Sequence, residues 1–175
     1  MPIYDSKPKK ATKDMYIKDR FITSGDNLNI IANRLLDSDR LIKLLTRNGS
    51  DVLTDDRPVT DEERAEAMRT NIGVIPIIDK DIEVNTFIAV QITDIVPTIQ
   101  GLTYNFVFDI LCNTEVWNLD GYNQRPYLIM NELDQLFSNT KMKSLGPATF
   151  LGAASLKINE KMLGYTMMFS FSEIQ

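Results

Sequence analysis

The chain has 175 residues, of which 43% are apolar, 25% charged and 9% aromatic, with one Cys and no His. These figures predict one globular domain with its own core, because a chain of this length buries about 70% of its unfolded surface. The lack of His excludes Ser-His-Asp and Cys-His catalysis, and one Cys excludes an internal disulfide. We interpret Cys112, which lies in an apolar run, as a buried reduced thiol; a reactive nucleophile is the alternative.

The net charge of −5 is unevenly distributed along the chain. Residues 1–20 hold six Lys or Arg against three Asp, a balance of +3, so residues 21–175 carry −8. This acidic body argues against a dedicated nucleic-acid binder, which usually shows a basic face. No apolar stretch approaches the roughly 20 residues of a membrane span, and no secretory signal is recognisable. We therefore expect a soluble protein made in the cytosol, with no cofactor.

The N-terminal part of the chain is predicted to be a flexible, extended basic arm, residues 1–24, followed by a helical section, residues 25–75. Helix signals begin at Ser24 or Asp26, either of which can cap a helix. Apolar residues at helical spacing follow at Leu28, Ile31 and Leu35.

Two further helix starts are predicted in this section. The first follows Asp37 or Ser38, and residues 49–59 then form a loop. The second is a capping box, in which Thr60 at the N-cap and Glu63 three residues later satisfy each other's backbone amides. The acidic residues of this turn need no further role, because the helix dipole favours negative charge there.

The second part of the chain, residues 84–175, is predicted to fold as a sheet with one helix. Alternating apolar residues predict one hairpin over Phe87–Cys112 and another over Thr149–Phe171. Between them a helix starts at Arg125-Pro126. Its apolar stripe consists of Ile129, Leu133, Leu136 and Phe137. Gly152 indicates a bulge or a close backbone approach. The expected architecture is α+β: a four-stranded antiparallel sheet in ββαββ order with one packed helix, forming a single domain over residues 25–175.

Carboxylate pairs are the remaining candidates for chemistry. Asp79, Asp81 and Glu83 alternate, but they lack the pattern of a calcium loop and are interpreted as a solvated turn. Asp109 with Glu115 is the one pair that suggests a two-metal nuclease. A cross-strand polar pair or a subunit contact explains Asp109 better. We therefore predict no catalytic, cofactor-binding or metal-binding residue.

Two sets of residues suggest a protein interface. Aromatic and basic side chains gather around the loop before the predicted helix. Such residues are frequent in protein interfaces and in nucleotide-stacking sites, and they also pack a loop against its own helix. They are Trp117, Tyr122, Arg125 and Tyr127. The exposed face of the last hairpin carries uncharged residues that do little to discourage strand addition by a neighbour. They are Thr166, Met168, Ser170 and Ser172.

The element order and two segments carry a family resemblance. These segments are Arg125-Pro126-Tyr127-Leu128-Ile129 and Leu163-Gly164-Tyr165. Over residues 28–175 the chain resembles bacteriophage neck proteins of the tail-terminator or tail-completion type, with head-to-tail connector ring proteins close beside them. The resemblance implies a homo-oligomeric ring, sixfold or twelvefold, that contacts portal, connector or tail proteins and lets DNA pass without specific binding. The N-terminal section exceeds the compact terminators, which favours a connector or adaptor ring.

We therefore expect a non-enzymatic structural subunit of a virion, assembled in the host cytoplasm, whose arm grips an adjacent ring. An acidic lumen would repel DNA phosphates and let the duplex slide. The alternatives are a carboxylate-metal nuclease that uses Asp109 and Glu115, and a small adaptor in a cellular complex.

Overall fold

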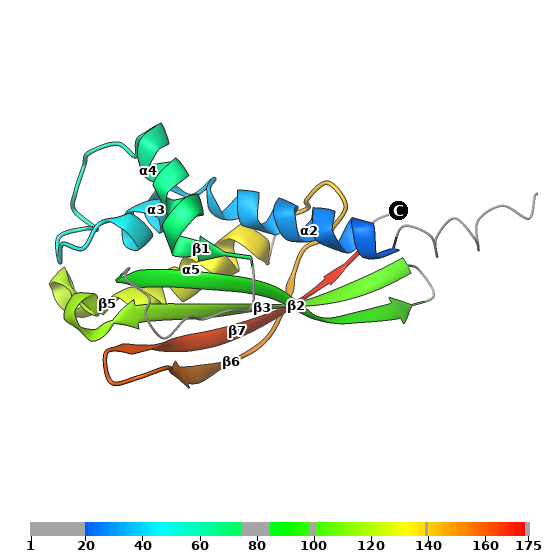
Figure 1. Cartoon of the computed structure of the whole chain (residues 1–175). Coiled ribbons are helices and arrows are strands. Elements are labelled where there is room, and N and C mark those ends of the chain that lie inside the picture. Colours follow the sequence, from blue (N-terminus) through cyan, green and yellow to red (C-terminus); the bar gives the residue numbers. More distant parts are fainter. Residues whose placement is uncertain (1–19, 75–84, 99–100, 139, 174–175) are drawn as a thin grey trace, which may run out of the picture.

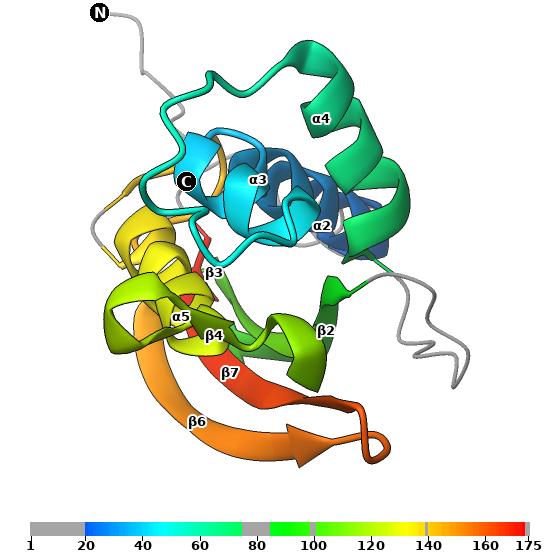
Figure 2. The ribbon, with the colours of Figure 1, turned by 90° about the vertical axis from the view of Figure 1, so that its left-hand side faces the viewer.

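The computed structural model describes residues 20–74, 85–98, 101–138 and 140–173, so the predicted arm lies outside the described residues up to position 19. Helices cover one face of a five-stranded sheet (Figure 1), and the other face carries no described helix (Figure 2). The described helices are α2 (Arg20–Leu35), α3 (Asp39–Thr46), α4 (Asp61–Glu66), the π-helical turn η1 (Ala67–Asn71) and α5 (Arg125–Phe137).

The helix starts are set by local chemistry, with one exception. Ser38 caps α3 by accepting a hydrogen bond from the Leu41 amide at 3.1 Å. The capping box of Thr60 and Glu63 at the start of α4 is present in both directions, so both predicted starts are confirmed. The predicted cap of α2 was wrong, because the helix begins at Arg20 and Ser24 lies inside it. Ser24 is buried there, one turn before Leu28 and on the same face of the helix.

The sheet has the strand order β1-β2-β3-β7-β6. Its strands are β1 (Ile72–Gly73), β2 (Thr86–Thr98), β3 (Gly101–Asn113), β6 (Thr149–Lys157) and β7 (Met162–Ser172). Both predicted hairpins are present as antiparallel pairs, and β3 and β7 are also antiparallel. The α+β class is confirmed. The four-stranded, purely antiparallel ββαββ sheet was wrong in detail, because β1 adds a fifth strand parallel to β2. With two residues, β1 is too short to leave a periodic pattern in the sequence.

A small second sheet lies where a loop was expected. The strands β4 (Asn118–Leu119) and β5 (Asn123–Gln124) pair across a tight reversal. Gly121 and Tyr122 both have positive φ angles, of 72° and 63°, which turn the chain within three residues. This reversal directs the chain into α5.

The core lies between the helices and the sheet. One side chain from each long strand forms a row across the helix-covered face, in the order Ile92, Phe106, Phe169 and Phe150. Phe137 of α5 packs on this row, with its ring centroid 6.1 Å from that of Phe169. Three of the four predicted stripe residues of α5 are fully buried, which confirms its predicted orientation. These aromatic contacts join α5 to the centre of the sheet.

Candidate interaction surfaces

The edge strand β6 is an open pairing surface. Among the described strands, β6 is hydrogen-bonded to β7 alone, and most of its residues are exposed. Its sequence Thr149–Lys157 contains no proline, and its one charged residue stands at the end. Natural sheet edges usually carry charges or proline that prevent pairing with other chains. The sequence interpretation assigned strand addition to the last strand, but β7 lies inside the sheet, and β6 holds the edge.

Two exposed apolar side chains stand at the start of β6, and we call them the β6 patch: Phe150 and Leu151. Their exposed fractions are 47% and 52%. The pairing register shifts between Phe150 and Gly152, so Leu151 is the extra residue of a bulge. This register shift confirms the predicted bulge at Gly152. Gly152 has a φ of 156°, a backbone conformation that suits glycine. The bulge therefore presents two large apolar side chains side by side at an open edge.

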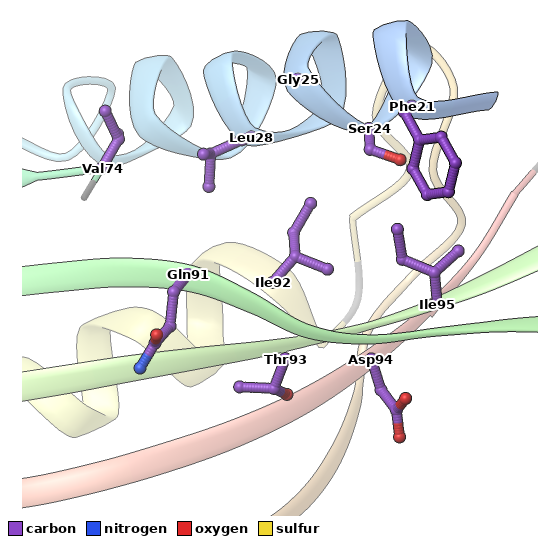
Figure 3. Close-up of a pocket in the computed structure, with 10 residues that line it drawn as sticks. All are labelled: Phe21, Ser24, Gly25, Leu28, Val74, Gln91, Ile92, Thr93, Asp94 and Ile95. Carbon is purple, nitrogen blue, oxygen red and sulfur yellow. The ribbon is translucent and has the colours of Figure 1, made fainter. Parts of the chain in front are cut away.

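A second apolar surface lies at the opposite edge of the sheet. A groove of about 530 Å³ runs between α2 and β2, and we call it the α2–β2 groove. Phe21 and Leu28 of α2 and Ile92 and Ile95 of β2 face one another across it (Figure 3). Phe21 is 77% exposed, and the neighbouring Ile22 is 66% exposed. Such a concentration of exposed apolar side chains is typical of a surface that binds a partner.

Arg125 is fully buried, so it cannot serve as an interface anchor or a stacking group. Its guanidinium donates to four main-chain carbonyls, those of Leu44, Arg47, Gly49 and Val116, at 2.6–3.2 Å. Burial lowers the pKa of this guanidinium below its usual range. The planar fork suits this task, because it presents five donors in fixed directions. Arg125 thus ties the end of α3 and the loop after it to the start of α5.

The aromatic residues predicted to cluster with Arg125 separate in the fold. Tyr122 is fully exposed at the reversal between β4 and β5. The hydroxyl of Tyr127 lies 2.5 Å from that of Tyr165, and this hydrogen bond raises the pKa of Tyr165. Trp117 packs against the core. Loop and helix packing therefore explains Trp117 and Arg125, whereas Tyr122 is fully exposed and Tyr127 is half exposed.

The acidic and thiol candidates take structural positions. Asp109 accepts a hydrogen bond of 2.5 Å from Thr166 on the neighbouring strand, as expected for a cross-strand polar pair. Glu115 lies in a short 3-10 turn after β3. Burial raises the pKa of the Cys112 thiol to about 12, which agrees with the buried-thiol interpretation. The acidic run from position 79 to 83 lies outside the described residues. Within the described ranges, no group of three or more Cys, Asp or Glu is placed to hold a metal ion.

An ionic cluster that the sequence did not predict fixes the loop before α4. Arg47, whose side chain is 11% exposed, pairs with Asp55 at 3.0 Å and with Glu63 at 2.8 Å. Arg57 also pairs with Asp55 at 2.6 Å. The hydrogen bond with Arg47 lowers the pKa of Glu63 to about 2, and the one with Arg57 holds the pKa of Asp55 well below its usual range. The capping box identified Glu63, but its partner Arg47 is brought in by the fold.

Fold and surfaces together define an α+β protein with helices on one sheet face and an open edge strand beside an apolar patch. The YomW family model matches residues 38–171, so the chain belongs to the YomW family. YomW is the name of a phage-derived protein, so membership of this family associates the chain with bacteriophage. Comparison with curated proteins and with solved structures finds no match. None of the described helices is long and apolar enough to span a membrane.

Proposed function

We propose that the chain is a non-enzymatic structural subunit of a phage virion, which forms a ring in the head-to-tail connector or neck. The observation that carries this proposal is the open β6 edge with its apolar patch. A monomer that leaves the outer edge of this nine-residue strand open, with Phe150 and Leu151 exposed on it, is prone to pair with other chains. In a ring subunit the same edge is covered by a neighbouring protein. The phage association of the family agrees with this role.

The distribution of charge supports a ring through which DNA passes. Residues 21–175 carry −8, and several of these charges are exposed around α4. They are Asp51, Asp56, Asp61 and Glu62. An acidic lining repels phosphates, so DNA slides past without being gripped. The basic segment 1–20 has the opposite sign and suits contact with an acidic neighbouring ring. Portal, connector or tail proteins are the partners this role requires.

The proposal is tested by measuring the oligomeric state of the full chain, alone and mixed with portal and tail proteins, by native mass spectrometry. We expect ring-sized oligomers, of six or twelve subunits. Leu151→Lys places a charge in the β6 patch and is expected to lower the assembled fraction at least tenfold. Tyr122→Lys is the control, because Tyr122 is also an exposed large side chain but lies outside the β6 patch, on the reversal before α5. A chain that stays monomeric under all these conditions contradicts the proposal.

A further inference from the structure

The β6 patch and the α2–β2 groove lie at the two ends of one row of side chains. The row of Ile92, Phe106, Phe169 and Phe150 crosses the sheet from β2 to β6 on the helix-covered face. Ile92 lines the groove at one end. Phe150, half exposed, stands at the other end. Phe150 and the groove therefore lie at the same level and on the same face of the sheet, at its two opposite edges.

The groove has the chemistry to receive an aromatic side chain. Leu28 and Ile92 form its walls, and Phe21 and Ile95 extend the apolar surface toward the start of α2 (Figure 3). The polar members of this part of β2, including Asp94, point away from α2 (Figure 3). Asp94 is the one charged residue among the described residues that line the groove, and its carboxylate is directed away from the apolar wall, while Phe150 and Leu151 of the β6 patch are uncharged. Burial of apolar surface on both sides is then the driving force for contact.

The β2 edge itself does not suit a continuous strand ladder. β1 already covers Ile88 and Ala89, and a bulge interrupts the edge between Ile92 and Asp94. Pro97 has no amide to donate. These features favour a contact made by side chains over one made by backbone pairing. If a second copy is placed beside the first in the same orientation, its β6 runs antiparallel to β2 of the first copy. The helix-covered faces of the two sheets then lie on the same side.

From these observations we propose that the β6 patch of one copy docks in the α2–β2 groove of a second copy. The inference rests on the proposed function and specifies how the ring subunits contact one another. The contact is head-to-tail, because it joins two different surfaces of the chain. Repetition of such a contact closes a ring when the rotation permits. A symmetric contact between two β6 edges would instead end at a dimer and leave both grooves empty.

Cysteine cross-linking of the full chain tests this arrangement. One preparation carries Phe150→Cys and the other Leu28→Cys, and they are mixed and treated with a short bifunctional maleimide. The native Cys112 is buried and does not compete. We expect a covalent dimer in the mixture, at least tenfold more abundant than in either preparation alone. Tyr122→Cys mixed with Leu28→Cys is the control, and it should give no dimer above background.

The outcomes separate this inference from the proposed function. If oligomers form but positions 150 and 28 do not cross-link, the docking contact is contradicted and the proposed function as a ring subunit is unaffected. A cross-link within the Phe150→Cys preparation alone shows a symmetric edge contact and also overturns the inference. A chain that is monomeric and gives no cross-link contradicts both.

Discussion

Replacing Arg125 by methionine removes the fully buried guanidinium and keeps most of the side-chain volume. Four carbonyls lose their donor, of which those of Leu44 and Val116 are buried and those of Arg47 and Gly49 are partly buried. A buried carbonyl left unsatisfied costs about 1–3 kcal/mol, and a partly solvated one about 0.5 kcal/mol. Relief of the desolvation cost of the buried cation offsets part of this sum. We expect Arg125→Met to lower the free energy of unfolding by about 3 kcal/mol, a large share of the usual total of about 5–15 kcal/mol.

Urea unfolding followed by the fluorescence of the single tryptophan measures this effect. Trp117 is a local reporter, because its carbonyl accepts a hydrogen bond from the Arg125 amide at 2.8 Å. Arg69→Met is the matched control: Arg69 is exposed and pairs with Glu66 one turn away, so the change should stay within about 0.5 kcal/mol. Arg125→Lys should recover part of the loss, because an ammonium donates fewer bonds in less fixed directions. An Arg125→Met variant within 1 kcal/mol of the parent chain would refute the reasoning.

Two further predictions concern acid stability and glycine. The pKa of Glu63 is lowered to about 2 in the folded chain, so its stabilising contribution is complete above the unfolded value near 4.5 and is lost as the pH falls toward 2. Glu63→Gln should therefore flatten the loss of thermal stability below pH 4.5, measured by circular dichroism, and an unchanged pH profile would contradict the ion pair with Arg47. At Gly164 a Cβ would overlap the carbonyl oxygen of Ile110, so Gly164→Ala should cost more than about 3 kcal/mol or prevent folding. At Gly25, inside α2, a Cβ meets nothing within 4 Å, so Gly25→Ala should raise stability by about 1 kcal/mol, and equal effects of both variants would exclude this account.

The parts of the fold that the sequence predicted depend on neighbours close along the chain. The capping box at Thr60, the apolar stripe of α5, the two hairpins and the bulge at Gly152 are all signalled within a few residues of one another. Local periodicity and cap chemistry do not depend on the rest of the fold.

The parts that could not be predicted depend on partners far apart in the chain. The carbonyls that Arg125 binds include those of Leu44 and Arg47, about 80 positions earlier. The α2–β2 groove combines Leu28 with Ile92, and no local pattern signals that pairing. The edge position of β6 follows from the pairing of β3 with β7, which places the last strand inside the sheet. For the same reason strand addition by a neighbour was assigned to the wrong strand.

The central claim, that the chain is a neck subunit of a virion, is tested most directly by locating it in the particle. Purified virions of the phage that carries this chain would be labelled with gold-conjugated antibodies against it and imaged by electron microscopy. The account predicts label at the junction of head and tail and, in averaged images, a ring of density there. Virions that contain none of the chain, or that carry the label elsewhere, would contradict it.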